Sequence, residues 1–373
     1  MSNYSEYQGI MRKIADIQYA SAVLNWDQET YMPSKGAAFR AQQLATLAGI
    51  GHELSTSIEL GNLLTKLSVD TTLTEKEKRN IKQSLKNYND NKKYSTEFVQ
   101  ELSKTISETF QAWQKAKTEN NFGLFAPFLE KLVKLKREEC KLLGDFPHPY
   151  DALLNQYEPG AKTADLEVLF TDVRNQLVTF VKQIAAKPQN KDNFMFLNYD
   201  REKQWQFGLD LLKQMGYDFE AGRQDASSHP FTTNFSAQDV RVTTRINEKD
   251  LNEMIWSCIH EGGHALYEQG LPSEEYGLPS GEYISLGIHE SQSRLWENNV
   301  GRSLSYWKAN FKTLQQTFSE NLASITFEDF YKAMNIVKPS LIRTSADELT
   351  YHFHVLIRFE IEKALIEGRL VER

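Results

Sequence analysis

The 373-residue sequence predicts a mainly α protein with a small antiparallel β-sheet beside one central helix. Two observations support this fold class. Apolar residues recur at helical spacing through most of the chain, as is typical of amphipathic helices. After Gly222 the pattern changes to β-branched residues with a period of two, which is typical of strands. The length suits one large core or two lobes around a groove.

The first half of the chain predicts helices almost throughout. Thr74 and Glu77 have the spacing of a capping box, in which each side chain bonds the backbone near the other residue. Pro33 and Gly144 mark breaks between segments. The helices expected in this half span residues 10–24, 37–54, a charged segment from 75, 95–116, 125–143, 163–181 and 204–215.

The second half predicts strands and further helices. Residues 229–235 and 239–245 are expected to form two strands with a turn near Ser236, and 281–286 a third strand. Asn247 is expected to cap the helix that Gly270 ends, and Ser345 to open a second capping box. The helices expected here span residues 248–269, 288–299, 306–322, 327–336 and 349–365.

The composition excludes several classes of protein. The net charge is −7 and the sequence has no basic patch, so we expect no nucleic-acid partner. No run of about 18 apolar residues exists, and the polar N-terminus lacks the apolar region of a signal peptide. Only Cys140 and Cys258 are present, far apart in the sequence. These features predict a cytoplasmic protein without a membrane partner.

Residues 260–264 read His-Glu-Gly-Gly-His inside a segment with helical periodicity. On a helix His260 and His264 lie one turn apart on the same face, so both imidazoles can bind one metal ion. Glu261 lies at the edge of that face, where it can act on a water molecule at the metal. With 8 His and 50 acidic residues, chance produces this pattern on the order of once in fifty such sequences. The alternative is a pair of structural histidines.

Gly262 and Gly263 lie inside this helix, where each glycine costs roughly 1 kcal/mol relative to alanine. We therefore expect another backbone to approach closely here, from a substrate or a neighbouring strand. The alternative is a helix whose packing simply tolerates both glycines.

A catalytic zinc site needs a third protein ligand and one open position. Glu290 at the start of the next predicted helix is our choice, because a second helix crossing the first suits a His₂Glu site. Glu297 is the second choice, and the alternative role for Glu290 is a salt bridge to Arg294 at i+4. The other acidic candidates downstream of His264 are Glu268, Glu274, Glu275 and Glu282.

The chain resembles the M32 family of zinc metallocarboxypeptidases, of the thermostable carboxypeptidase type. The resemblance extends over essentially the whole chain and rests on a series of motifs in order. These motifs are Leu24-Asn25-Trp26-Asp27-Gln28-Glu29, Tyr31-Met32-Pro33, His229-Pro230-Phe231, Asp239-Val240-Arg241-Val242-Thr243, His260-Glu261-Gly262-Gly263-His264, His289-Glu290-Ser291-Gln292-Ser293-Arg294 and Ile342-Arg343-Thr344-Ser345-Ala346-Asp347. It implies two lobes around a groove, and zinc ligands at His260, His264 and Glu290.

The resemblance also implies a reaction and a substrate. The enzyme would hydrolyse the last bond of peptides with a free C-terminus, using Zn²⁺ or another divalent ion such as Co²⁺. Glu261 would be the general base. Arg343 is the first candidate for binding the terminal carboxylate, Arg241 the second, and His229 a further substrate-binding candidate. Each arginine could instead form a buried ion pair, for instance with Asp347 or Asp239.

One departure from the family pattern concerns the C-terminus. Family chains normally continue past this point with a Gly-x-x-Gln-Asp-x-His-Trp motif near the active site, which residues 1–373 lack. We therefore expect a single catalytic domain over 1–373 that is short at its C-terminal end, and family members commonly form homodimers. Two alternatives stay open: a truncated zinc- or peptide-binding remnant with little turnover, and an endopeptidase or aminopeptidase with the same zinc helix.

Overall fold

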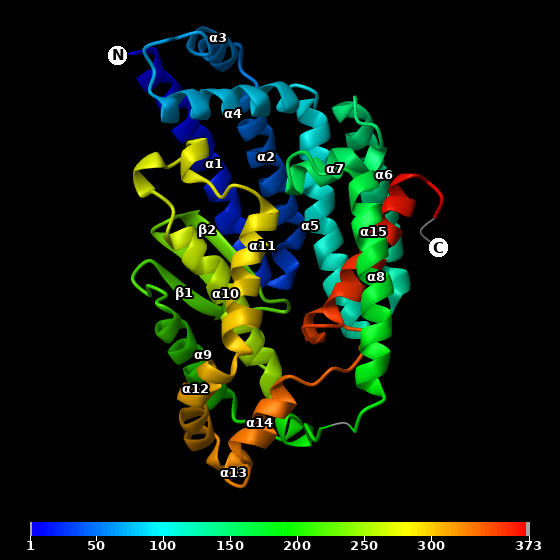
Figure 1. Ribbon diagram of the computed structural model, residues 1–373. Helices are drawn as coiled ribbons and strands as arrows, with labels where there is room; N and C mark the ends of the chain where they lie inside the picture. Colours follow the sequence, from blue (N-terminus) through cyan, green and yellow to red (C-terminus); the bar gives the residue numbers. More distant parts are fainter. Residues whose placement is uncertain (1, 189, 371–373) are drawn as a thin grey trace.

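The computed structural model describes residues 2–188 and 190–370, and helices dominate it as predicted (Figure 1). The helices of the first half are α1 (Asn3–Thr30), α2 (Ala37–Ser55), α3 (Ile58–Leu67), α4 (Glu75–Asn91), α5 (Thr96–Glu119), α6 (Ala126–Leu143), α7 (Pro149–Tyr157), α8 (Thr163–Ala185) and α9 (Arg201–Met215). The predicted capping box is confirmed, because Thr74 and Glu77 bond each other's backbone at the start of α4.

The second half forms a small sheet and the remaining helices. The strands are β1 (Gly222–Ala226), β2 (Thr232–Ser236) and β3 (Asp239–Thr244). The helices are α10 (Leu251–Gln269), α11 (Leu286–Arg294), which continues as a π-helical segment (Leu295–Gly301), α12 (Leu304–Thr317), α13 (Ser319–Leu322), α14 (Phe327–Met334) and α15 (Tyr351–Ile366).

The sheet is mixed, so the prediction of a purely antiparallel sheet is wrong. β2 and β3 form the expected antiparallel pair, but β1 lies on the other side of β3 and runs parallel to it. The reason is topological: β3 inserts between β1 and β2, and β1 points opposite to β2. The sequence Gly-Arg-Gln-Asp-Ala of β1 has neither β-branched residues nor an alternating pattern, and this strand was not predicted.

Helix α10 is buried between two apolar clusters. Its Leu251, Met254 and Cys258 pack against side chains of α9 and α12, and are at most 1% exposed. Ala265 on another face packs against Val240 and Val242 of β3. Burial of this kind contributes roughly 1.5–3 kcal/mol for each large apolar side chain. The position of α10 is therefore fixed from both sides.

Three local predictions in the second half are wrong. Residues 281–286 form no strand; a 3₁₀ turn ends at Gly281, and α11 begins at Leu286. Asp250, not Asn247, caps α10 by accepting a hydrogen bond from the Asn252 amide. Helix α15 begins at Tyr351, so Ser345 does not cap it.

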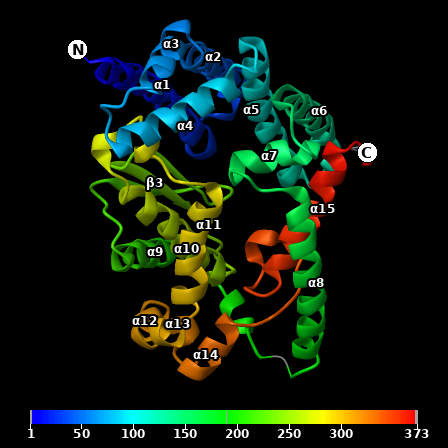
Figure 2. The same cartoon turned by 45° about the horizontal axis from the view of Figure 1, so that its top comes forward.

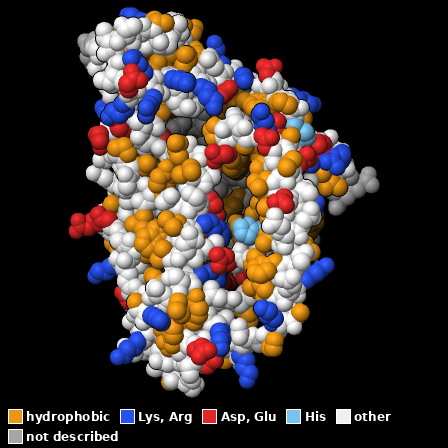
Figure 3. All heavy atoms as spheres, in the orientation of Figure 1, with side chains coloured by type: hydrophobic (Ala, Val, Ile, Leu, Met, Phe, Trp, Pro, Cys, Tyr) orange, Lys and Arg blue, Asp and Glu red, His pale blue; other side chains and the backbone are white. Residues whose placement is uncertain are grey.

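The molecule is hollowed between two sides. In Figures 1 and 2, α10, α11 and α12 lie on one side, and α8 and α15 on the other. Figure 3 shows the surface depressed between them, with basic, acidic and histidine side chains inside the depression. This arrangement agrees with the expected two lobes around a groove. Within the described residues, no helix is both long enough and apolar enough to cross a membrane.

Candidate metal centre

The histidines of the His-Glu-x-x-His sequence share one face of α10. The ring centroids of His260 and His264 lie 5.0 Å apart, as expected for residues one helical turn apart. The neighbouring apolar residues of α10 are fully buried, so the helix cannot rotate without exposing them. The face with both imidazoles is therefore held toward α11.

Helix α11 brings Glu290 to the two imidazoles. The Oε2 atom of Glu290 lies 3.2 Å from Nε2 of His264 and 3.8 Å from Nε2 of His260. One possible ligand atom from each of the three residues lies within 4.8 Å of the others. The three residues chosen from the sequence as a ligand set thus converge in space.

The second carboxylate oxygen of Glu290 faces Arg294. Arg294 Nε donates a hydrogen bond to Glu290 Oε1 at 3.2 Å, so the salt bridge considered as an alternative is also present. Burial alone would raise the pKa of Glu290, but the hydrogen bond from His264 and the charges of His260 and Arg294 lower it to about 2. Glu290 is thus an anion that still directs one oxygen at both histidines.

Glu297, the second-choice ligand, contacts the far side of His260. Its Oε2 atom lies 2.7 Å from Nδ1 of His260 and accepts a hydrogen bond from Arg294 Nη1 at 2.9 Å. Burial would lower the pKa of His260, but the hydrogen bond with Glu297 and the charges of Glu261 and Glu290 raise it. A carboxylate on Nδ1 orients the ring and leaves Nε2 facing the cluster.

A second histidine–glutamate pair lies behind His264. The ring of His289 stacks on that of His264 with centroids 4.5 Å apart, and its Nε2 lies 2.7 Å from Oε1 of the buried Glu268. Asn234 of β2 donates to the other oxygen of Glu268 at 2.7 Å. Within the described residues, Nδ1 of His264 is buried without a hydrogen-bond partner. His264 is therefore oriented by its contact with Glu290 through Nε2 and by stacking on His289.

Glu261 is buried next to the sheet. The Thr232 hydroxyl of β2 donates to Glu261 Oε2 at 2.7 Å, and the residue is only 6% exposed. This hydrogen bond uses the edge of the sheet to fix the carboxylate on the helix that contains both histidines. A strand of the sheet thus positions a candidate site residue of α10, a contact that no sequence pattern indicates.

The three substrate-binding candidates lie in different environments. Burial, followed by the charges of Arg343 and Lys117, lowers the pKa of His229 to about 4. Arg343 Nη1 donates to the Tyr351 hydroxyl at 3.1 Å. Arg241 instead forms two hydrogen bonds with Asp239, at 2.9 and 2.8 Å, which is the ion pair considered as its alternative role.

The close approach expected at the two glycines comes from helices, not from a strand or a substrate. A Cβ atom on Gly263 would lie 2.7 Å from Cα of Ser293 in α11. A Cβ atom on Gly262 would lie 2.8 Å from Leu212 Cδ2 and Met215 Cε, which are ends of side chains in α9. Gly263 therefore lets the α11 backbone come near enough for Glu290 to reach the histidines.

Gly263→Ala and Gly262→Ala form a matched pair that tests this role. Both changes favour the helix by about 1 kcal/mol, but only Gly263→Ala collides with backbone. We expect Gly263→Ala to lower the free energy of unfolding by about 1–3 kcal/mol more than Gly262→Ala, and to weaken metal binding. Chemical denaturation and equilibrium metal dialysis measure both effects. Equal metal affinity in the two variants would show that the close approach of α11 at Gly263 is not needed for metal binding.

Sequence reasoning did not find the supporting residues. Thr232, Glu268 and Tyr351 contact the candidate site residues, and Glu297 was considered only as a ligand. For Glu297 a signal existed, since it lies seven residues after Glu290 and so near the same helix face. Glu268 lies one turn after His264 on α10 and was considered only as a ligand, not as the partner of His289. For Thr232 and Tyr351, no spacing rule links residues of different elements.

Comparison with known proteins identifies a family model and curated relatives that match this chain. The family model of the Carboxypeptidase Taq (M32) metallopeptidases matches residues 6–373. Carboxypeptidase 1 of Bacillus subtilis is 36% identical over 98% of this chain and 73% of its own length. Thermostable carboxypeptidase 1 of Thermus thermophilus is 38% identical, over 99% of this chain and 76% of its own.

A solved structure supports the same relationship at the level of the fold. The crystal structure named BsuCP superposes with a TM-score of 0.98 at 35% identity, covering 100% of this chain and 75% of that one. The chain thus spans about three quarters of the length of these relatives. The matched motifs, the fold and the family model agree, and the chain belongs to the M32 family of metallocarboxypeptidases, which are peptide hydrolases.

Proposed function

We propose that this protein is a zinc-dependent carboxypeptidase that hydrolyses the C-terminal bond of peptides. His260, His264 and Glu290 are the metal ligands in this proposal, and Glu261 is the general base. The observation that carries it is the convergence of the three donor atoms within 4.8 Å of one another, on the helix that also presents Glu261 and on the helix that follows it.

The donor set fits a catalytic zinc ion. Two imidazoles and one carboxylate are a known ligand set for zinc hydrolases, and they leave one position open. The carboxylate of Glu297 on His260 adds the outer support that such histidines usually have. A bound Zn²⁺ supplies a Lewis acid that polarises the scissile carbonyl and lowers the pKa of water. Co²⁺ is the alternative ion for the same ligands.

The residues of the chain perform the proton transfers and the positioning. Glu261 accepts the proton of the attacking water and delivers it to the nitrogen of the departing amino acid. Its Oε2 atom is held by Thr232, so the carboxylate keeps one orientation through both transfers. Burial of Glu261 keeps bulk water away from this carboxylate.

Arg343 is the better candidate for binding the terminal carboxylate. Its hydrogen bond goes to the Tyr351 hydroxyl, and within the described residues it forms no salt bridge, so its charge is available. Arg241 is already neutralised by Asp239 and stacks on Trp26, with 4.6 Å from the guanidinium carbon to the ring centroid. An arginine can bind a carboxylate through two parallel hydrogen bonds.

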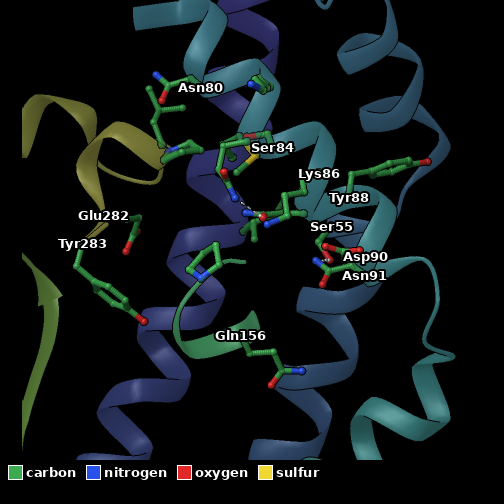
Figure 4. A pocket seen from close by; sticks show the side chains of 18 of the residues that line it. Ser55, Asn80, Ser84, Lys86, Tyr88, Asp90, Asn91, Gln156, Glu282 and Tyr283 are labelled. Atoms are coloured by element: carbon green, nitrogen blue, oxygen red, sulfur yellow. Dashed lines mark hydrogen bonds between the residues drawn. The ribbon is translucent and has the colours of Figure 1, made fainter. Parts of the chain in front are cut away.

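The rest of the peptide has space next to α11. A cavity of about 1340 Å³ is lined by side chains of α1, α4 and α7 and by the segment before α11 that contains Tyr283 (Figure 4). Tyr283 packs edge-on against His289 at 5.1 Å, and His289 stacks on His264. Polar side chains such as Asn80, shown in the close-up, face this cavity. We assign the cavity to the upstream residues of the substrate.

Arg343→Ala is expected to raise KM about 10- to 100-fold for N-blocked peptides with a free C-terminus. Their C-terminal amides, measured as competitive inhibitors, should bind with nearly unchanged Ki, because they lack the charge that Arg343 recognises. Arg241→Ala is the matched control, and Arg174→Ala on the surface of α8 is a second one. If Arg241→Ala gave the selective loss instead, the two arginines would exchange roles.

One experiment tests the proposed function as a whole. Bound metal is quantified in the purified chain of residues 1–373, and hydrolysis of N-blocked peptides is compared with that of their amides. We expect one zinc per chain and release of the terminal amino acid from free acids only. Hydrolysis indifferent to amidation would indicate an endopeptidase or aminopeptidase. Bound zinc without hydrolysis at high enzyme concentration would indicate a binding remnant.

Location and assembly are part of the proposal. Cys140 and Cys258 are both buried and unpaired, which supports the expected cytoplasmic location. The homodimer expected from the resemblance is tested by light scattering of the purified chain.

A further inference from the structure

Tyr351, the first residue of α15, contacts two arginines at once. Its hydroxyl accepts a hydrogen bond from Arg343 Nη1 at 3.1 Å. Its ring faces the guanidinium group of Arg294, whose Cζ atom lies 3.7 Å from the ring centroid. A planar cation over an aromatic face is attracted by the ring quadrupole, and the attraction increases when water is excluded. One side chain thus links two cations.

The two arginines belong to different parts of the proposed active site. Arg294 bonds the candidate ligand Glu290 at 3.2 Å, and it bonds Glu297, which in turn holds His260, at 2.9 Å. Arg343, whose Nη1 bonds the Tyr351 hydroxyl, is the residue proposed to receive the substrate carboxylate. Tyr351 therefore contacts both the arginine that supports the proposed metal ligands and the arginine proposed to bind the substrate.

The loop before α15 is fixed to the start of that helix. Asp347 Oδ1 accepts hydrogen bonds from the backbone amides of Leu349 and Thr350, at 3.0 and 2.9 Å. Its Oδ2 accepts from the Thr350 hydroxyl at 2.6 Å and from the Lys338 amide at 2.9 Å. Arg343 and Tyr351 are therefore held at the two ends of one short braced segment. A preformed orientation reduces the side-chain entropy that Arg343 loses on binding.

We propose that Tyr351 is a positioning residue with two separable roles: its hydroxyl orients Arg343 for the substrate carboxylate, and its ring supports Arg294 behind Glu290. The proposal rests on the function proposed above, and it adds that carboxylate recognition and metal retention share one side chain. It follows that removing the hydroxyl and removing the ring have different consequences.

Two variants separate the roles, and a third controls for the chemical change. Tyr351→Phe removes only the hydroxyl, while Tyr351→Leu removes the ring as well. Tyr331→Phe makes the same change at a partly buried tyrosine of α14. Calorimetry on the metal-free proteins measures the Kd of an N-acylated peptide as the free acid and as the C-terminal amide. Competition with a chelating dye measures the Kd for Zn²⁺, and thermal unfolding checks the fold.

For Tyr351→Phe we expect the Kd of the free acid to rise about tenfold, with the amide and Zn²⁺ affinities unchanged within about twofold. Tyr351→Leu should show the same loss and, in addition, a Kd for Zn²⁺ raised about tenfold or more. Tyr331→Phe should bind like the unaltered protein in all three measurements.

Other results overturn the proposal. If Tyr351→Phe weakened binding of the free acid and of the amide equally, the hydroxyl would have only a structural role. Unchanged Zn²⁺ affinity in a folded Tyr351→Leu protein would reject the support of Arg294. If Arg343→Ala loses the preference for the free acid and Tyr351→Phe keeps it, the positioning role fails while the proposed function stands. No preference in the unaltered protein would overturn both.

Discussion

Glu261→Gln is expected to abolish peptide hydrolysis while Zn²⁺ stays bound. Glutamine keeps the size of the side chain and can still accept the hydrogen bond from Thr232. It cannot take a proton from water, and general-base catalysis of this kind contributes about 10²–10⁴-fold in rate. We therefore expect kcat to fall by at least that factor, with bound zinc and KM nearly unchanged. Steady-state kinetics and metal analysis of the same preparation measure this result.

Two comparisons make the Glu261 result specific. Glu274→Gln, the same change at an exposed glutamate soon after α10, should leave kcat unchanged. Thr232→Val should lower kcat by a smaller factor, because the carboxylate remains but loses its fixed orientation. Activity of Glu261→Gln within about tenfold of the unaltered enzyme would assign the base to another residue.

Glu290→Ala is expected to have the largest effect on metal binding. The change removes the only anion among the three proposed ligands, and it also removes a partner of Arg294. Loss of a supporting residue around a metal typically costs 10- to 100-fold in affinity, so loss of a direct ligand should raise the Kd for Zn²⁺ by at least about 100-fold. Equilibrium dialysis at a fixed pH measures this change, and hydrolysis should fall in parallel.

Glu297→Gln is the matched test of the alternative ligand assignment. If Glu297 only orients His260, its loss should raise the Kd for Zn²⁺ by about 10- to 100-fold, less than the loss of Glu290. Glu290→Gln shows whether charge or mere contact matters at that position. A larger effect for Glu297 than for Glu290 would identify Glu297 as the third ligand and Glu290 as the partner of Arg294.

The parts of the site that the sequence predicts are those that depend on one helix or on two helices that follow each other. His260, Glu261 and His264 follow from helical spacing alone, since the period of 3.6 residues fixes which side chains share a face. Glu290 required one more step, namely that the next helix crosses α10. The glycines predicted a close approach correctly, but whether strand, substrate or helix approaches is decided by tertiary packing.

The parts that failed depend on contacts between distant segments. Residues 281–286 have a strand-like composition, but a strand forms only where another strand is available for pairing, and here Gly281 packs against the backbone of Glu275. Strand β1 lacks strand-like residues, yet β3 supplies a partner for its backbone. The choice between Arg241 and Arg343 depends on whether a neighbouring acid neutralises the charge, which is visible only in three dimensions.

The π-helical segment Leu295–Gly301 follows α11 directly, and it contains Glu297. A π turn holds one residue more than an α turn, and such insertions occur frequently at functional sites. Deleting one residue between Glu290 and Glu297 would rotate the following side chains by about 100° relative to α11. Glu297 would then leave His260 even though every named residue was still present. The number of residues between Glu290 and Glu297 therefore matters as much as the identity of either residue. Insertions and deletions in this segment should be tolerated far less than substitutions.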